Sequence, residues 1–372
     1  MRNYIYVIFI VVATFFACQQ SPNQANKVEL RLNNDLDICD IFSNVEVIPL
    51  EDLDNAVVDQ LITKTILHNN YIYILNPRLT TIFIFDQNGR FINKLEKGVG
   101  PNEFFNALDI NVNRFTGNLE VLTRNRIMIY DSMGETMISS ERIETPHLPT
   151  RFYNIDSQTD VLFCKYADQK LVYYNRTNNS IINSIYELPT YIYDSPLGFN
   201  TTPFYFYNDT VRLLQGYNGD VFSLCPAREK LSMLKYVEWD FGINKFSYQQ
   251  IEAKTNIVDY INECSNISKQ TPLGFLSYGE NNKYLFTQFW YAGKPVSMIY
   301  NKKNGESEIF ESFKGGIKFS FFHVDDEYCY LLVPACDITE VVNKKMLETY
   351  LIELPDINEE SNPIFIKYKF KK

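Results

Sequence analysis

The chain has 372 residues, of which 45% are hydrophobic and 15% aromatic, and its formal charge is −10 at pH 7. An acidic protein repels phosphate backbones, so this charge disfavours nucleic acid as a partner. The length would suffice for two domains, but the 26 Tyr and 28 Phe residues and the rarity of helical periodicity favour one large β architecture.

Residues 1–17 are predicted to be a signal peptide. Arg2 supplies a positive charge, and the apolar run from Ile5 to Ala17 is too short to span a bilayer comfortably. The run ends in Ala17-Cys18, which resembles the lipobox of bacterial lipoproteins. That resemblance implies that Cys18 is lipidated and becomes the mature N-terminus. The alternative is an ordinary cleaved signal peptide followed by a chance cysteine.

Residues 18–27 are predicted to be a lipidated tether, because the segment after Cys18 is polar and has no periodic pattern. Multiple acylation would hold the protein on a membrane without a spanning helix. Loss of residues 1–17, which hold one Arg and no acid, changes the charge from −10 to −11. Some bacteria use acidic residues just after the lipidated cysteine as a surface-export signal. None is present here, which favours an outer-membrane lipoprotein that faces the periplasm.

Residues 28–372 are predicted to form one domain, because a pattern of three strands repeats along them. In its first copy Asn88-Gly89 marks a tight turn between the second and third strands, which are Thr81–Asp86 and Arg90–Leu95. The equivalent residues Asp86 and Asp131 are 45 residues apart. Later copies begin near Asn118, Asp160, Thr210, Lys283 and Tyr328. This repeat predicts an all-β, six-bladed β-propeller with aromatic side chains between the blades.

Two segments fall outside this repeat. Val45–Leu50 precedes the first copy, and we expect it to add a strand to the last blade and close the ring. Phe246–Cys264 lacks strand alternation, and its isoleucines lie near helical spacing. We therefore expect a short helix inserted between blades four and five, on one face of the disc. It would serve as a packing element or, alternatively, line the mouth of the propeller.

Three segments carry a resemblance to a known family: Val47–Glu51, the hairpin Ile84–Ile92 and the loop Lys97–Phe104. The chain resembles the six-bladed β-propeller lipoproteins of Gram-negative gut-type bacteria, which are related in fold to NHL-repeat propellers. The resemblance covers the whole mature chain, although the third, fourth and sixth blades match loosely. It implies a fold and export, and it implies no common activity or catalytic residues.

The loop after the first repeat is one candidate ligand site. Gly98 and Gly100 permit tight turns whose backbone amides could cradle an anion, and Glu103 follows them. No Lys-Ser or Lys-Thr pair follows, as a P-loop would require. The alternative is a rigid crossover between blades in which Glu103 bonds to nearby backbone.

Arg124 and Arg126 form a second candidate site, near the end of a presumed inner strand of the second blade. Such a pair could receive a carboxylate or a sulfate, or could be solvated in a loop. A dense aromatic stretch contains Tyr191, Tyr193 and Phe204–Tyr207. These aromatic side chains would stack on sugar rings at the mouth of the propeller or fill the core between blades.

Metal chemistry has little support in the sequence. The 3 histidines, His68, His147 and His323, are far apart, and the cysteines form no CxxC pair, which disfavours zinc. Ca²⁺ stays possible, since carboxylates and Asn at a propeller axis could bind it. Asp86 and Asp131 could belong to such a ring, although their place before a turn favours local backbone bonding.

The leading functional hypothesis is a lipid-anchored binding module whose partner is a glycan, a peptide or an envelope protein. The alternative is a Ca²⁺-dependent hydrolase or lyase, which requires Asp, Glu, Asn or His side chains converging on the axis. No catalytic residue is assigned, because the chain has no Gly-x-Ser-x-Gly elbow and no local Cys/His arrangement. A structural subunit of an envelope complex would instead present a large exposed apolar patch.

Overall fold

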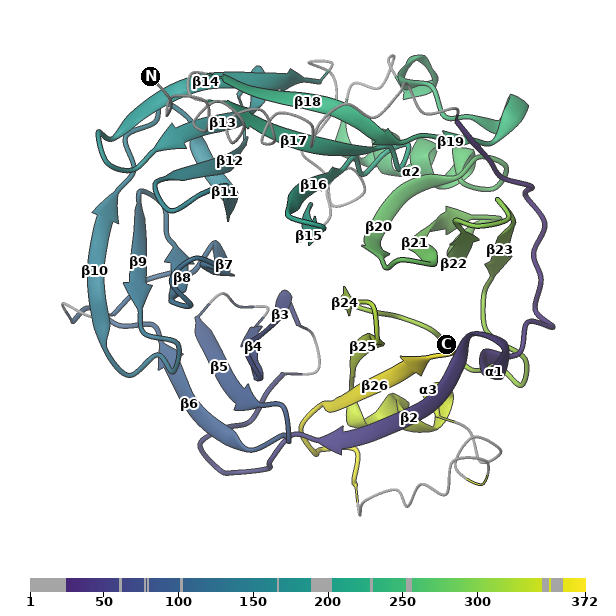
Figure 1. Ribbon diagram of the computed structural model, residues 1–372, viewed down its shortest axis with the longest axis horizontal. Coiled ribbons are helices and arrows are strands. Elements are labelled where there is room, and N and C mark those ends of the chain that lie inside the picture. Colours follow the sequence, from purple (N-terminus) through teal and green to yellow (C-terminus); the bar gives the residue numbers. More distant parts are fainter. Residues whose placement is uncertain are drawn as a thin grey trace, which may run out of the picture.

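The computed structural model describes residues 25–59, 62–76, 78, 80–100, 103–165, 167–188, 203–227, 230–251, 256–342, 348 and 357–372. Cys18 and the predicted signal peptide lie outside these residues. Within them, 6 four-stranded antiparallel sheets stand around a central axis (Figure 1). The predicted six-bladed propeller is therefore confirmed.

The first three blades follow one another along the chain, each from its inner to its outer strand. Blade 1 consists of β3 (Lys64–His68), β4 (Tyr71–Leu75), β5 (Thr81–Asp86) and β6 (Phe91–Glu96). Blade 2 consists of β7 (Asp109–Val112), β8 (Leu119–Leu122), β9 (Arg126–Tyr130) and β10 (Met137–Arg142). Blade 3 consists of β11 (Leu148–Asn154), β12 (Thr159–Lys165), β13 (Gln169–Asn175) and β14 (Ser180–Glu187).

The next two blades repeat this order, and the last blade takes its outer strand from the N-terminal part of the chain. Blade 4 consists of β15 (Phe204–Tyr207), β16 (Thr210–Leu214), β17 (Val221–Ala227) and β18 (Lys230–Val237). Blade 5 consists of β20 (Leu273–Glu280), β21 (Tyr284–Tyr291), β22 (Lys294–Asn301) and β23 (Ser307–Phe310). Blade 6 consists of β24 (His323–Val324), β25 (Tyr328–Val333), β26 (Ile364–Phe370) and β2 (Phe42–Pro49).

Strand β2 closes the ring, as the pattern of Val45–Leu50 predicts. It pairs antiparallel with β26, so that Val45 lies opposite Tyr368 and Val47 opposite Ile366. In this last copy the repeat pattern predicts a further strand at 349–354, and these residues lie outside the described part of the chain. β25 pairs directly with β26.

The N-terminal segment reaches blade 6 along the outer edge of the disc. β1 (Asn26–Lys27) pairs in parallel with β19 (Trp239–Asp240), and Leu32 then bridges to Ile309 of blade 5 (Figure 1). Asn26 and Lys27, which the sequence pattern places at the end of the tether, lie opposite Trp239 and Asp240 in this pairing.

The segment between β19 and β20 is helical only in part. It contains the 3-10 helices η1 (Gly242–Asn244) and η2 (Tyr248–Ile251) and then α2 (Ile257–Ile267). The single helix expected over Phe246–Cys264 therefore starts later, at residue 257, where the Asn256 side chain accepts the N–H of Asp259 at 2.9 Å. The other short helices are α1 (Ile38–Ile41), η3 (Ala335–Asp337) and α3 (Ile338–Val341).

The hydrophobic core is divided into clusters between neighbouring blades. One cluster joins Tyr73 and Ile84 of blade 1 to Ile110 and Val121 of blade 2, all almost fully buried. A blade is a thin sheet with two apolar faces, so each face needs a neighbour to exclude water. This packing explains the high content of Tyr and Phe.

The hairpins between outer strands are stabilised by an Asp at the end of the first strand. Asp86 Oδ1 accepts the N–H groups of Asn88 at 2.8 Å and Arg90 at 3.0 Å. Asp131 Oδ1 accepts two N–H groups of the equivalent turn in blade 2. Both aspartates thus have the local turn role that their position in the repeat favours.

Candidate functional site

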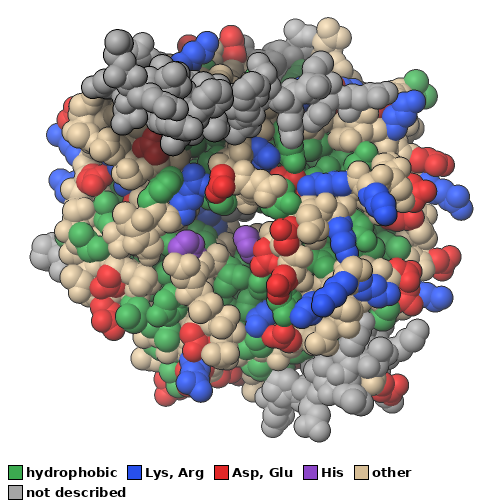
Figure 2. Space-filling view, in the orientation of Figure 1, with side chains coloured by type: hydrophobic (Ala, Val, Ile, Leu, Met, Phe, Trp, Pro, Cys, Tyr) green, Lys and Arg blue, Asp and Glu red, His purple; other side chains and the backbone are tan. Residues whose placement is uncertain are grey.

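The inner strands of all six blades converge on one cavity of about 290 Å³ at the axis. Figure 2 shows the central opening of the disc, with histidine, basic and acidic side chains around it. Each inner strand (β3, β7, β11, β15, β20 and β24) contributes at least one lining residue. The size is at the lower end of the range for small-molecule sites.

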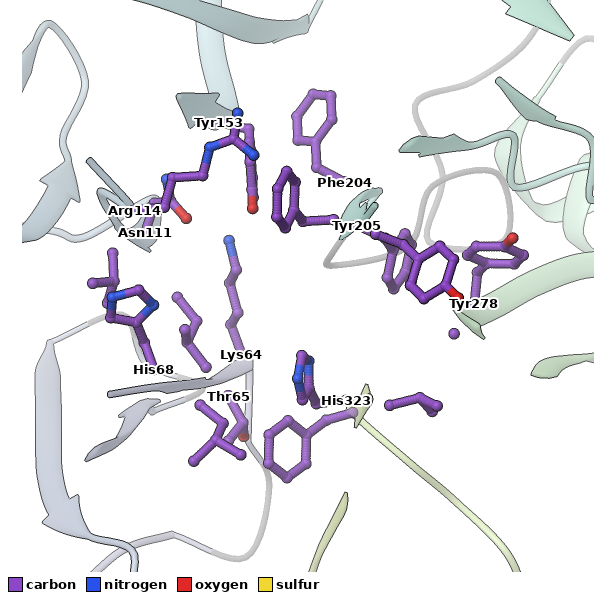
Figure 3. Close-up of a pocket in the computed structure, with 18 of the residues that line it drawn as sticks. Lys64, Thr65, His68, Asn111, Arg114, Tyr153, Phe204, Tyr205, Tyr278 and His323 are labelled. Atoms are coloured by element: carbon purple, nitrogen blue, oxygen red, sulfur yellow. The ribbon is translucent and has the colours of Figure 1, made fainter. Parts of the chain in front are cut away.

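One wall of the cavity is aromatic. Four consecutive residues of β15, Phe204–Tyr207, line it together with Tyr153 and Tyr278 (Figure 3). The Tyr205 and Tyr278 rings meet edge to face, with centroids 5.6 Å apart. Phe204 also packs in the core between blades 3 and 4, whereas Phe206 is 38% exposed. The aromatic stretch therefore serves both as core and as cavity wall; its first part, Tyr191 and Tyr193, lies outside the described residues.

Two cations line the cavity in different ways. Lys64 Nζ donates to Asp109 Oδ1 at 2.8 Å and to the Ile110 carbonyl at 2.7 Å. Burial lowers the pKa of Lys64, and the Asp109 charge opposes that shift. Arg114 lies in the turn after β7, and its Cζ stands 4.0 Å from the centre of the Phe206 ring.

Glu280 is the only described lining residue with a carboxylate, and its charge is compensated. It is 3% exposed, accepts Lys302 Nζ at 3.0 Å and the Tyr236 hydroxyl at 2.9 Å, and lies 3.4 Å from Arg212 Nε. The described part of the chain contains no group of 3 or more His, Cys, Asp or Glu that could hold a metal ion. The described residues therefore offer no such cluster in support of a Ca²⁺-dependent hydrolase or lyase.

Two histidines stand at this cavity although they are far apart in the sequence. His68 ends β3 and His323 begins β24, and both line the axial cavity and an adjoining one of about 590 Å³. Burial lowers the pKa of both imidazoles, so they are neutral near pH 7 and each has one donor and one acceptor nitrogen. His147 is exposed, in the loop before β11.

We expect His323 to make stability depend on pH. Its pKa is lowered in the folded protein, with Asp325 partly opposing the effect of burial. Below about pH 6.5 the unfolded chain takes up a proton that the folded state resists, so stability is lost as the pH falls. Between pH 7.5 and 5.5 the melting temperature of His323→Gln should therefore decline less than that of the wild type, by about 1–2 °C. His147→Gln is the exposed control, and parallel declines for all three proteins would refute the assignment.

The Gly98–Glu103 loop binds its own carboxylate. Glu103 Oε2 accepts the N–H of Gly100 at 2.7 Å, and a Cβ built on Gly98 would lie 1.8 Å from the same oxygen. The Glu103 carboxylate thus occupies the place at the backbone N–H groups where an anion could have bound. The loop joins β6 to β7, and its described residues do not line the axial cavity.

Arg124 and Arg126 do not reach the axial cavity. Both are exposed, and the strand that they follow, β8, is the second strand of blade 2 rather than the inner strand as expected; Arg126 itself begins β9. Its Nη1 donates to Ser140 Oγ of β10 at 3.2 Å. The sequence-based candidates therefore lie at three separate places, and only the aromatic stretch lines the cavity.

The repeat pattern marks only the three outer strands of each blade, so it does not point to Lys64 or Arg114. A signal for two inner strands is nevertheless present. Asn69-Asn70 has φ of 45° and 69°, and Asn208-Asp209 has φ of 46° and 54°. Two successive residues with positive φ are typical of a tight hairpin turn, for which Asn and Asp are favoured. These pairs mark the connections β3–β4 and β15–β16.

The fold defines this protein as a six-bladed β-propeller with an axial cavity. The chain belongs to the family described as Domain of unknown function (DUF4934), whose model matches residues 25–369. No curated protein matches the chain.

The comparison with solved structures finds similar chains of low sequence identity. A presumed exported protein from Bacteroides fragilis has 15% identity and a TM-score of 0.68, with 94% of this chain and 100% of that chain covered. A protein of unknown function from Bacteroides caccae has 10% identity and a TM-score of 0.40, over 67% of this chain and 82% of that chain. The first of these likenesses supports the fold alone. None of the helices in the described residues has the length and apolar character needed to cross a membrane.

Proposed function

We propose that the protein is an exported, lipid-anchored propeller of the cell envelope that captures a small ligand in its axial cavity. The observation that carries this proposal is the convergence of six inner strands on one small cavity with an aromatic wall. Binding sites of this kind combine apolar surface with a few polar groups that orient the ligand. Lys64, Arg114 and the neutral His68 and His323 supply such groups.

The proposed envelope location rests on the N-terminal sequence. The apolar run ending in Ala17-Cys18 has the form of a lipoprotein signal, and the residues after it lack the acidic surface-export pattern. The proposal is therefore an outer-membrane lipoprotein on the periplasmic side. In the structure the chain joins the disc at its outer edge, where β1 pairs with β19 (Figure 1). An anchor attached there leaves the axial opening accessible.

We expect Cys18→Ala to release the protein from the membrane. Without the thioether-linked lipid the chain has lost its anchor, so the variant should move from the membrane fraction to the soluble envelope fraction. Cys336→Ala, at an exposed cysteine, is the matched control and should stay with the membranes. Membrane association of the Cys18→Ala chain equal to that of the wild type would contradict the lipid anchor.

The capture of a ligand is tested by thermal shift on the soluble Cys18→Ala chain. A ligand that binds only the folded state raises the melting temperature by mass action. Pools of glycans and of peptides are the probes, and Phe206→Ala is the cavity variant. Phe105→Ala removes a ring of the same kind that is 73% exposed and does not line the cavity. We expect one pool to raise the melting temperature of the parent and of Phe105→Ala but not of Phe206→Ala. No shift with any pool, or a shift that Phe206→Ala retains, would argue against the axial site.

A further inference from the structure

We infer that the axial cavity selects a sugar ring that bears a carboxylate, and that Arg114 is the residue that receives this carboxylate. The inference rests on the proposed capture of a ligand in the same cavity. Two features of the cavity carry it: the charge of Arg114, which no carboxylate of the described residues matches, and the aromatic strand β15 beside it.

Two other cations at or beside the cavity are paired with carboxylates. Lys64 lies 2.8 Å from Asp109, and Lys302 lies 3.0 Å from Glu280. Arg114 forms no ion pair with a described residue, and its one hydrogen bond there runs from Nη2 to the Ile155 carbonyl at 3.3 Å.

Arg114 therefore has donors to offer. A guanidinium carries five N–H donors. Its Nε is buried and has no hydrogen-bond partner among the described residues. A buried donor without a partner is costly, and a bound acceptor would remove that cost.

Two aromatic rings hold the guanidinium in place. Its Cζ lies 4.0 Å from the centre of the Phe206 ring and 4.7 Å from the centre of the Phe115 ring. Both distances are within the range of cation–π contact. Such contacts use none of the N–H donors, so a planar guanidinium can still form two parallel hydrogen bonds to a carboxylate. In Figure 3 the Arg114 and Lys64 side chains extend from neighbouring blades into the same part of the cavity.

The charges at the cavity favour an anionic ligand. Asp109 matches Lys64, and Lys302 and Arg212 together more than match Glu280. Arg114 adds a positive charge that no described carboxylate matches, within a protein whose overall charge is −10. A carboxylate placed against Arg114 would compensate that charge.

The rest of the cavity suits a polyhydroxylated ring. The aromatic residues Phe204–Tyr207 offer flat surfaces on which the C–H face of a pyranose packs. His68 and His323 offer nitrogen donors and acceptors, and Thr65 adds a hydroxyl. About 290 Å³ accommodates one such ring rather than an extended chain.

The test is calorimetric titration of the soluble Cys18→Ala chain with three probe pairs. Each pair is a hexuronate and its neutral hexose: glucuronate with glucose, galacturonate with galactose, and mannuronate with mannose. The members of a pair differ only in a carboxylate against a hydroxymethyl group. We expect at least one hexuronate to bind about 10–100-fold more tightly than its hexose, the range for a charge-assisted hydrogen bond. Arg114→Met should remove this preference, and Arg114→Lys should restore part of it.

Controls separate this inference from the proposed function. Arg126→Met removes an exposed arginine of the same blade and should leave binding unchanged. Equal binding of acid and neutral sugar, lost in Phe206→Ala, would overturn the carboxylate preference while leaving ligand capture intact. If Arg114→Met still bound the hexuronate as tightly as the parent chain, the role of Arg114 would be overturned. Benzoate, titrated as an aromatic carboxylate without hydroxyl groups, should bind more weakly than the hexuronate. If it bound more tightly, the preference for a sugar ring would be overturned. Absence of binding by every sugar, together with no thermal shift from any pool, would overturn both proposals.

Discussion

Replacement of Arg176 by Met is expected to lower the free energy of unfolding by about 3–5 kcal/mol, the usual cost of breaking a buried ion pair. Arg176 follows β13, and its Nε and Nη2 lie 2.5 Å from Asp160 Oδ2 and Glu120 Oε2. The side chains of Asp160 and Glu120 are 0% and 1% exposed. Because Glu120 belongs to blade 2 and Asp160 to blade 3, Arg176 joins two neighbouring blades as well as two carboxylates.

The pH dependence of this loss has a definite sign. Burial raises the pKa of Asp160 to about 6 even beside Arg176, and removal of the cation should raise it further. A carboxyl whose pKa is raised on folding takes up a proton more readily in the folded state, so stability is lost as the pH rises through that pKa. The Arg176→Met variant should therefore be least stable near pH 8 and recover as the pH falls toward 5.

Urea unfolding at pH 8 and pH 5.5 measures both effects. Arg142→Met is the matched control, because the Arg142 side chain is 66% exposed and its nearest carboxylate oxygen is 3.9 Å away. An exposed pair of this kind contributes at most about 1 kcal/mol. If Arg176→Met were no less stable than Arg142→Met at pH 8, the buried pair would not hold the two blades together.

Phe42→Ala is expected to cost about 3–5 kcal/mol, the range for removing a fully buried aromatic ring. Phe42 begins β2 and is 1% exposed. Its ring centroid lies 5.0 Å from that of Tyr368 and 5.2 Å from that of Phe370, both in β26. The ring thus fixes the strand that closes the propeller, and its loss leaves a cavity at the junction of the two ends of the chain.

The control for Phe42 is Phe105→Ala, which removes a ring that is 73% exposed and should change stability by about 0.5 kcal/mol or less. Chemical denaturation of both variants gives the comparison. A loss for Phe42→Ala as small as that for Phe105→Ala would mean that closure through β2 contributes little to stability.

The sequence pattern was sufficient to predict the six-bladed architecture, because the repeat lies in the three outer strands of each blade. β4, β5 and the strands equivalent to them pack in the layers between blades, so their apolar residues recur in every copy. Closure by Val45–Leu50 was also predictable, since a segment that reads as a strand but lacks a blade needs an edge to pair with.

The inner strands were harder to predict, and they hold the site. Their side chains face the axis rather than a neighbouring blade, so β3 mixes Lys64 and His68 with apolar residues. β24 has only 2 residues, too few for any alternation. Arg114 lies in a turn, and only closure of the ring brings it to β15, about 90 residues later in the chain. A pattern of local periodicity contains no information on such distant neighbours.

The decisive experiment is a crystal structure of the protein with the first ligand that raises its melting temperature. We expect this ligand to occupy the axial cavity, with contacts from β15 and from at least two other inner strands. A ligand bound instead at the Gly98–Glu103 loop, at Arg124 and Arg126, or elsewhere on the rim of the disc would contradict it.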